Sequence, residues 1–361
     1  MNSCPGSKAI GSANRFGWAH YHDGVGNATL EVNMTQDNTN NVKVLFIAGP
    51  GRSGSTLLDM LLGQINGFYS TGELRFIWSR GFEQNQLCGC GQPFRKCEFW
   101  AEVVKEGFGG FEAIDYVRIE KLRGAAERRF SKGLSLRSES ELLAPYEEYF
   151  DACRNLYRGI QKISGCEFII DSSKTTAHGY ILANIPQIDL FTLHLIRDSR
   201  AVAYSWRREK IRPEIYWERK LMGQRKIISS AIRWNFQHKL AEKLQHSSKG
   251  YALLRYEDLV SNPKKSLLEL FIDLGIEQPS LDFIDGFHAN IKTSHTVSGN
   301  PVRFTNKEIK IKPDTEWQHA MANRHKWLVT LITWPLLLKY GYFKDQKLRD
   351  KTGVPSLLKG S

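Results

Sequence analysis

Residues 44–56, VLFIAGPGRSGST, join an apolar run rich in branched side chains to a glycine-rich turn that ends in Ser and Thr. A strand followed by such a turn and a helix is typical of a phosphate-binding loop, because backbone amides and the helix N-terminus can bind an anion there. Nucleotide-hydrolysing loops read G-x-x-x-x-G-K-[ST], and Gly49 and Gly54 occupy the glycine positions. Ser55 replaces the lysine, and Thr56 keeps the hydroxyl. The pattern therefore predicts an anion site without the lysine that nucleotide hydrolysis uses.

Four short apolar runs, each followed by a polar loop and a helical pattern, predict buried strands at 42–49, 167–171, 190–198 and 251–259. Strands that are apolar on both faces fit a parallel sheet covered by helices on both sides. The sequence therefore predicts an α/β fold with a P-loop-like doubly wound parallel sheet, and a ligand at the carboxyl ends of its strands. The first helix should begin near Ser55.

Composition suggests where the domain begins and ends. Residues 1–41 are rich in Asn, Gly and Ser and nearly free of branched apolar side chains, which predicts a disordered leader. One domain is expected over 42–345, followed by a flexible tail at 346–361. Within the domain, 112–164 is helical in pattern and highly charged. This segment predicts a helical insertion that either covers the sheet or forms one wall of the site.

The 361-residue chain carries a formal net charge of +12. Such an excess suggests a polyanionic partner, which could be nucleic acid, an anionic membrane surface or a highly phosphorylated cofactor. The chain has no Lys/Arg-rich block interleaved with aromatic residues of the kind that follows a nucleic-acid backbone. The charge therefore favours a cofactor, and no nucleic-acid partner is expected.

Two segments bear on membrane association. Residues 1–41 contain no continuous apolar stretch that resembles a signal peptide. The run 327–338, WLVTLITWPLLL, is too short to span a bilayer and is interrupted by Pro335, so a buried terminal helix is expected there. The sequence thus predicts no transmembrane segment and a cytoplasmic protein.

The six cysteines form no regular framework, but three of them are close together in the sequence. Cys88, Cys90 and Cys97 lie in LCGCGQPFRKCEFW, where a C-x-C pair and a third cysteine could hold a metal or form a disulfide that fixes a loop. Three thiolates are one ligand short of a closed zinc site, and no histidine lies nearby in sequence. The choice between metal and disulfide stays open, and no metal ligand is assigned.

Three further motifs follow the loop along the chain: DSSK at 171–174, IRDSRAVAYSW at 196–206 and GNPVRF at 299–304. Together with GPGRSGST they resemble the superfamily of sulfotransferases that depend on 3′-phosphoadenosine 5′-phosphosulfate (PAPS). The pattern is similar to that of bacterial-type members, with an active site like that of tyrosylprotein sulfotransferases. The resemblance implies an enzyme that moves a sulfuryl group from PAPS to a hydroxyl or amine of an acceptor.

The resemblance also implies how the two anionic ends of PAPS are held. In the superfamily the loop after the first strand wraps the 5′-phosphosulfate, and the equivalent residues here are Arg52, Ser53, Gly54, Ser55 and Thr56. A later motif binds the 3′-phosphate through an arginine and a serine, which Arg197 and Ser205 match. Arg303, in a segment that resembles the late nucleotide-contacting loop, is expected to reach the same phosphate. Two separate cradles fit a donor with anionic groups at both ends.

Three residues are expected, by the same resemblance, to carry the chemistry. Glu73 lies just beyond the first helix, where the tyrosylprotein branch has its catalytic glutamate, and would accept the proton of the acceptor. Arg52 and Lys174 match the catalytic arginine and lysine of that branch and would stabilise the transferring sulfuryl group and its leaving oxygen. This transfer requires a base and cations, and no metal. His178 is a second choice of base, whereas His194 is expected to be a core residue.

Side-chain positions can test two of these expectations. If Glu73 is not the base, it is expected to be a surface carboxylate that pairs with Arg75 or Arg80. His295, in the segment SHTVSGNPVRF, is expected to lie near the nucleotide.

Three questions stay open at the level of sequence. The basic segment 206–220 is either a lid over the acceptor, with Trp217 and Arg219 as contacts, or a solvated surface loop. A P-loop nucleotide kinase would need the lysine that Ser55 replaces and a magnesium-binding acid. A noncatalytic binding protein could keep the same fold. The sequence does not specify the acceptor or the oligomeric state.

Overall fold

The computed structural model describes residues 41–132, 144–305 and 307–343. The predicted leader, apart from Asn41, and the predicted tail at 346–361 lie outside these residues. The proposed domain limits therefore stay predictions.

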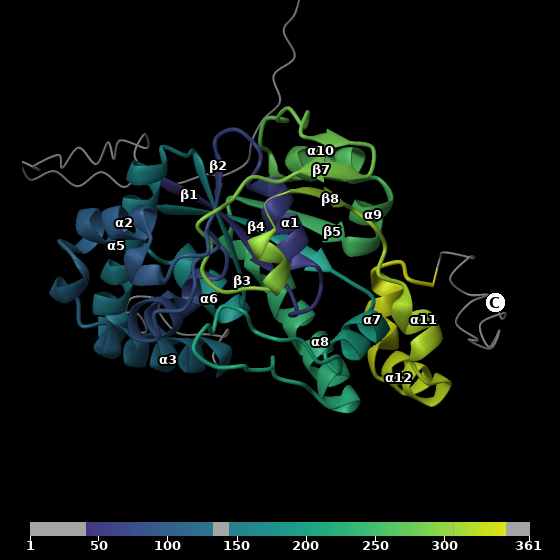
Figure 1. The fold of residues 1–361 in the computed structure, drawn as a ribbon. Helices are drawn as coiled ribbons and strands as arrows, with labels where there is room; N and C mark the ends of the chain where they lie inside the picture. Colours follow the sequence, from purple (N-terminus) through teal and green to yellow (C-terminus); the bar gives the residue numbers. More distant parts are fainter. Residues whose placement is uncertain (1–40, 133–143, 306, 344–361) are drawn as a thin grey trace, which may run out of the picture. The chain divides into compact units, whose positions relative to one another are not determined.

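A five-stranded parallel sheet runs through the described residues in the order β2-β3-β1-β4-β5 (Figure 1). Its strands are β1 (Val42–Ala48), β2 (Phe68–Ser70), β3 (Phe168–Lys174), β4 (Ile188–Ile196) and β5 (Gly250–Arg255). The predicted doubly wound parallel sheet is confirmed, and its four expected strands are present. The run expected at 251–259 is a strand only as far as Arg255. Strand β2 was not predicted, because three residues are too few for a periodic pattern.

Helices connect these strands and cover both faces of the sheet. They are α1 (Ser55–Leu62), α2 (Glu98–Phe108), α3 (Tyr116–Lys132), α5 (Glu147–Ser164), α6 (Thr176–Ala183), α7 (Ser199–Ser205), α8 (Ile227–Lys243), α9 (Tyr256–Ser261), α10 (Pro263–Leu274), α11 (Glu316–Ala320) and α12 (Asn323–Lys339). A π-helical segment spans Ile77–Glu83. A small antiparallel sheet joins β6 (Ile284–Asp285), β7 (His288–Asn290) and β8 (Glu308–Lys310).

Alternate residues of β1 enter two different cores, as expected for a strand that is covered on both sides. Val44 and Phe46 belong to the core formed with α2, α3, α5 and α6. Leu45 and Ile47 belong to the core formed with α1, α9 and α10. The uninterrupted apolar run of β1 is thus explained by burial of both of its faces.

The segment 112–164 was expected to be helical, and in the part of it that the structure describes α3 and α5 are its main elements. α5 packs against α2 and contacts β1 and β3, whereas α3 packs against α6 (Figure 1). α5 therefore helps to cover one face of the sheet.

The helix expected at 327–338 is present within α12, but it is buried on one side only. Val329 and Leu337 are fully buried, whereas Trp327, Leu331 and Trp334 are about half exposed (57%, 54% and 50%). The expectation of a buried terminal helix was therefore wrong for this second face. Among the described residues, no helix is long and apolar enough to cross a membrane.

The strand order places a topological switch at β1. The chain goes from β1 to β2 and β3 on one side, and β4 and β5 then add on the other side. In doubly wound sheets the crevice outside the carboxyl ends of the strands at such a point is the usual ligand site. Here Ala48 of β1 is level with Lys174 of β3 and with His194 of β4.

Asp59, on the buried side of α1, should make stability depend on pH. Burial raises the pKa of its carboxyl from 3.8 to about 7, although the Ser70 hydroxyl donates to Oδ2 at 2.7 Å. The folded chain then keeps a proton that the unfolded chain has released, so this group lowers stability as the pH rises from about 4 to about 7. Asp59→Asn should therefore raise the free energy of unfolding at about pH 8 by roughly 1 to 3 kcal/mol and leave it nearly unchanged near pH 4.

Urea unfolding at these two pH values measures the effect. Asp273→Asn, which changes an exposed carboxylate on α10, is the matched control and should follow the wild type. An identical pH dependence in the wild type and in Asp59→Asn would show that Asp59 is not the group responsible.

Candidate active site

The loop between β1 and α1 has a backbone that few residues tolerate. Gly49 and Gly54 have φ angles of 135° and 93°. A β-carbon on Gly49 would lie 2.4 Å from the carbonyl oxygen of Leu195, and one on Gly54 would lie 2.4 Å from the ring of Tyr256. Arg52 has a φ of 74° although it is not glycine, a strained conformation that clusters at functional sites. The glycines thus let the loop lie directly against the end of β4 and the start of α9.

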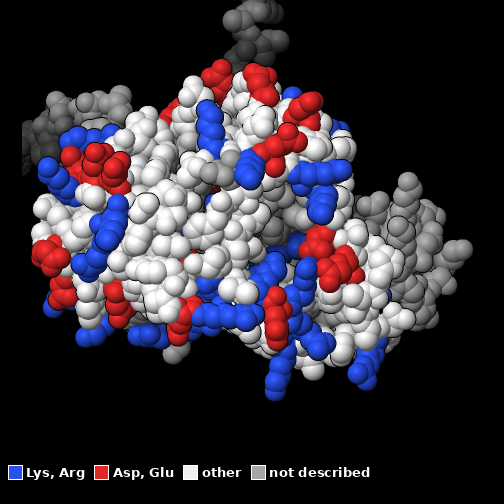
Figure 2. All heavy atoms as spheres, viewed as in Figure 1, with Lys and Arg blue, Asp and Glu red and all other residues white. Residues whose placement is uncertain are grey.

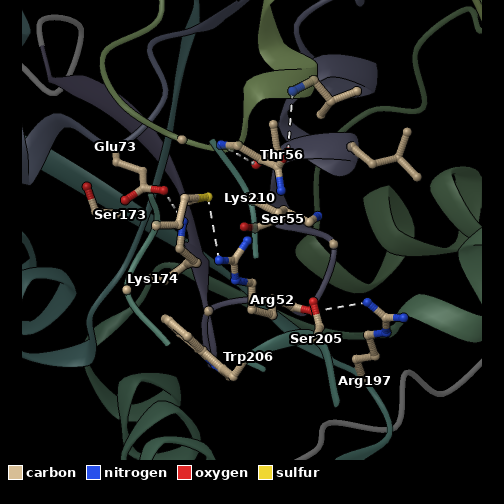
Figure 3. A pocket seen from close by; sticks show the side chains of 18 of the residues that line it. Arg52, Ser55, Thr56, Glu73, Ser173, Lys174, Arg197, Ser205, Trp206 and Lys210 are labelled. Atoms are coloured by element: carbon tan, nitrogen blue, oxygen red, sulfur yellow. Dashed lines mark hydrogen bonds and ion pairs between the residues drawn. The ribbon is translucent and has the colours of Figure 1, made fainter. Parts of the chain in front are cut away.

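A pocket of about 750 Å³ opens at this loop (Figure 3). Its lining includes Gly54, Ser55 and Thr56, at the start of α1. The first amides of a helix have no carbonyl partner one turn earlier, so those of α1 are available at the wall of the pocket. The N-terminus of a helix favours a bound anion. None of the described residues of 112–164 lines the pocket, so the structure gives no support for that segment as a wall of the site.

The pocket is strongly cationic. Ten of the residues that line it are lysine or arginine, and two, Glu73 and Asp314, are acidic. Figure 2 shows lysine and arginine side chains gathered around a hollow in this face of the molecule. Burial is the main cause that lowers the pKa of Arg52, of Lys210 and, to about 10, of Arg80. The pocket therefore holds partly desolvated cations, an arrangement that suits a polyanionic ligand.

Glu73 and Lys174 form an ion pair in the pocket, with 2.6 Å between Oε1 and Nζ (Figure 3). Their side chains are only 13% and 14% exposed. Lys174 ends β3 with a left-handed backbone (φ 66°), and its Nζ also donates to the carbonyl oxygen of Ser172 at 2.9 Å. The backbone amide of Glu73 donates to the carbonyl oxygen of Val297 at 2.7 Å. Hydrogen bonds to backbone carbonyls thus hold both the Lys174 side chain and the Glu73 backbone in position.

Glu73 does not form the surface pair that was considered for it. Arg75 pairs with Glu127, whose Oε1 lies 3.0 Å from its Nε, and Arg80 donates to the hydroxyl of Ser298. Glu73 therefore has Lys174 as its cationic partner.

Arg52 lines the same pocket and has only weak partners. Its Nη2 is 3.5 Å from the sulfur of Met222, and its guanidinium carbon is 5.0 Å from the centre of the Trp206 ring. Among the described residues Arg52 forms no ion pair. Its charge is therefore available to an anion in the loop.

Arg197 follows β4 directly and lies at another part of the same pocket. Its Nη2 pairs with Asp314 Oδ2 at 3.0 Å, and its Nη1 donates to the carbonyl oxygen of Arg52 at 3.1 Å. The guanidinium lies over the ring of Tyr256, at 4.5 Å from its centre, and its buried Nε has no hydrogen-bond partner among the described residues. Ser205, the last residue of α7, lines the pocket as well. The structure thus brings the predicted Arg197 and Ser205 into one cavity with Arg52.

Two predicted cofactor residues do not line the pocket. Ser53 is buried, and its hydroxyl has no hydrogen-bond partner among the described residues. Arg303 is also buried, and its guanidinium donates to the carbonyl oxygens of Thr296 at 2.5 Å and Leu87 at 2.8 Å. The position of Arg303 gives no support to a phosphate contact, because the side chain joins two loops instead.

The three histidines considered from the sequence do not line the pocket. His178 is buried, with its Nε2 3.2 Å from Oδ2 of Asp171. His194 is buried in the core, with a nitrogen 2.7 Å from one of His238, and burial lowers the pKa of His194 to about 4. His295 lies among cysteine side chains, so its expected position near the nucleotide is not supported.

The basic segment 206–220 contributes to the pocket mainly through its first half, with Trp206, Lys210 and Arg212. The two contacts named from the sequence, Trp217 and Arg219, are exposed and do not line it. Whether this segment moves as a lid stays a prediction.

Sequence reasoning missed much of the positive charge. Further cations in the lining are Arg75, Arg80, Arg225, Arg233 and Lys312. They come from separate parts of the chain, and no local pattern marks them. Only the high net charge pointed to such a surface.

Comparison with known proteins gives the family. The model of the sulfotransferase family matches residues 45–280, and a search of curated proteins finds no match. Among solved structures the chain is similar to the "Sulfotransferase Domain from the Curacin Biosynthetic Pathway" (15% identity, TM-score 0.42, covering 82% of this chain and 97% of that one). It is also similar to the "Sulfotransferase Domain from the Synechococcus PCC 7002 Olefin Synthase" (18% identity, TM-score 0.39, covering 82% and 96%). Because the family model spans well over half of its length, the chain belongs to the sulfotransferase family.

Proposed function

We propose that this sulfotransferase takes its sulfuryl group from PAPS and transfers it to a hydroxyl or amine by in-line displacement. One observation carries the proposal: a single pocket combines the N-terminus of α1, the Arg52 cation and the Glu73–Lys174 pair. An anion site beside a carboxylate and a lysine is what the transfer of an anionic group to a proton-bearing acceptor requires.

The 5′-phosphosulfate of the donor is proposed to lie in the loop. Gly54, Ser55 and Thr56 would bind it through their amides and hydroxyls, and Arg52 would supply the cation. Ser53, whose hydroxyl is buried, would contribute its backbone amide. The absence of the usual loop lysine fits this assignment, because Arg52 brings a positive charge to the same loop.

The 3′-phosphate is proposed to lie against Arg197 and Ser205. The buried Nε of Arg197 is a donor without a protein partner among the described residues, and a phosphate oxygen would satisfy it. Asp314 already pairs with Nη2 of the same guanidinium and would compete with the phosphate for its charge. We therefore expect Asp314 to move away from Arg197 when the phosphate binds.

In the proposed reaction the acceptor oxygen or nitrogen attacks sulfur, and its proton passes to the Glu73 carboxylate. The bond between sulfur and the bridging oxygen of the 5′-phosphate breaks, and adenosine 3′,5′-bisphosphate leaves with the bonding electrons. Lys174 and Arg52 would stabilise the negative charge that spreads over the sulfuryl and bridging oxygens. Lys174 Nζ is 2.6 Å from Glu73 Oε1, so the proposed base and cation would act at the same place.

Arg197→Ala should weaken the binding of adenosine 3′,5′-bisphosphate by about 10- to 100-fold, the range expected for a lost charge-assisted hydrogen bond. Calorimetric titration of the purified protein measures this affinity. Arg219→Ala removes an exposed arginine that does not line the pocket and should bind like the wild type. No binding by the wild type, or equal affinity for Arg197→Ala, would remove the cofactor assignment.

Glu73→Gln should lower the rate of sulfuryl transfer by ~10²- to 10⁴-fold, because general-base catalysis supplies about that much. Binding of the bisphosphate should stay within about threefold of the wild type, since the change removes no proposed cofactor contact. Single-turnover assays with radiolabelled PAPS, on an acceptor found in a panel of hydroxyl and amine compounds, measure the rate. Glu83→Gln, an exposed glutamate at the end of the π-helical segment, is the control. A Glu73→Gln enzyme with a near-normal rate would exclude Glu73 as the base.

The identity of the acceptor stays open, and so does the oligomeric state. The cytoplasmic location remains a prediction from the sequence. A nucleotide kinase is the less favoured interpretation, because Ser55 heads α1 where that chemistry places a lysine.

A further inference from the structure

The three clustered cysteines have a fourth potential ligand that the sequence did not reveal. Cys88, Cys90, Cys97 and His295 place their three sulfur atoms and one ring nitrogen within 4.8 Å of one another. The Nδ1 of His295 is 3.1 Å from the sulfur of Cys97 and 3.8 Å from that of Cys88, and the sulfurs of Cys90 and Cys97 are 3.7 Å apart. The histidine comes 198 residues after Cys97, so local spacing could not show it.

These distances fit a tetrahedral ion. With Zn–S bonds of about 2.3 Å and a Zn–N bond of about 2.0 Å, a tetrahedron has edges of about 3.5 to 3.8 Å between its ligands. The sulfur–sulfur separation of 3.7 Å matches the sulfur–sulfur edge of about 3.8 Å. The two sulfur–nitrogen separations, 3.1 and 3.8 Å, lie on either side of the sulfur–nitrogen edge of about 3.5 Å. Three thiolates and an imidazole are a common ligand set for structural zinc.

The backbone around the cysteines is shaped for such a site. The backbone carbonyl oxygen of Cys88 accepts a hydrogen bond from the amide of Gly91 at 2.9 Å. The backbone amide of Cys88 donates to the carbonyl oxygen of Gln92 at 2.8 Å, and the two bonds close a tight turn. A β-carbon on Gly89 would lie 2.4 Å from the carbonyl oxygen of Ser294, so this glycine lets the turn touch the segment that carries the histidine. The turn and the histidine segment therefore meet through their backbones as well as through the four ligands.

The cluster is also enclosed. Cys88 and Cys97 are 1% exposed, and Cys90 and His295 are half-buried. The ring of His295 stacks on Phe99, with 5.1 Å between centres and 23° between planes, which fixes its orientation. Four protein ligands in an enclosed position leave no open coordination site, as in structural rather than catalytic zinc sites.

We propose that Cys88, Cys90, Cys97 and His295 bind one structural zinc ion. The ion joins the turn at 87–93 and the start of α2, which Cys97 precedes, to the segment at 294–299. This segment includes Val297, whose carbonyl accepts from the amide of Glu73 and whose amide donates to Thr71. The zinc ion thus fixes the backbone that positions Glu73. The zinc site itself does not depend on the proposed function, and only this consequence for Glu73 rests on it.

Elemental analysis of the purified full chain, expressed without a metal-binding tag, tests the site directly and needs no assay of activity. One zinc ion per chain is expected. Cys90→Ser changes the most accessible of the three cysteines and should lose the zinc and lower the melting temperature. Cys166→Ser, which changes a buried cysteine outside the cluster, should keep the zinc.

Thiol titration decides between the two possibilities that the sequence left open. After denaturation with a chelator and without reductant, a zinc protein shows all six cysteines as thiols, whereas a disulfide within the cluster leaves four. Purified wild type with no zinc, with another metal in its place or with four thiols would overturn the proposal. If Cys90→Ser fails to fold, removal of zinc from the wild type by the chelator and its readdition, followed by the melting temperature, gives the same decision.

Discussion

The parallel pairing of β1 with β3 on one side and with β4 on the other is the interaction on which the rest of this structure depends. Each of the three strands delivers one part of the candidate site at its carboxyl end: β1 leads to Arg52, β3 ends at Lys174, and β4 is followed by Arg197. Ala48 is level with Lys174 in the ladder, so a change of register would separate the loop from the lysine. The backbone of the sheet therefore sets the geometry of the chemistry.

The same arrangement gathers positive charge at one place. Lys210, Arg52 and Arg80 are partly desolvated, which lowers their pKa values and opposes the charged form that an anion needs. A bound polyanion would reverse this cost, because it neutralises charges that otherwise repel one another. Affinity for a polyanion and the cost of burying these cations in the unliganded pocket would thus have one physical origin.

Sequence reasoning succeeded where the signal was local and failed where it was not. The strand, the loop and the start of α1 could be predicted because burial and anion binding require apolar residues, glycines and a helix N-terminus in one short segment. Glu73 and Lys174 were named only by resemblance, and their pairing across 101 residues is a result of the fold. The position of Arg303 does not support its predicted phosphate contact, because its guanidinium donates to backbone carbonyls. The cysteine neighbours of His295 are remote in sequence, so no local pattern could show them. The prediction that α12 is buried was wrong for one of its sides, because an apolar run does not show whether one face of a helix or all of them pack against the core.

The proposed function requires that the loop hold a phosphosulfate and that the group transferred from it be sulfuryl. The most direct measurement offers the enzyme sulfur-labelled PAPS and γ-phosphorus-labelled ATP with magnesium, side by side, over the same panel of acceptors. We expect transfer of the sulfur label, with one adenosine 3′,5′-bisphosphate released for each product, and no transfer of the phosphorus label. Transfer of the phosphorus label alone would show that the site serves a nucleotide kinase instead.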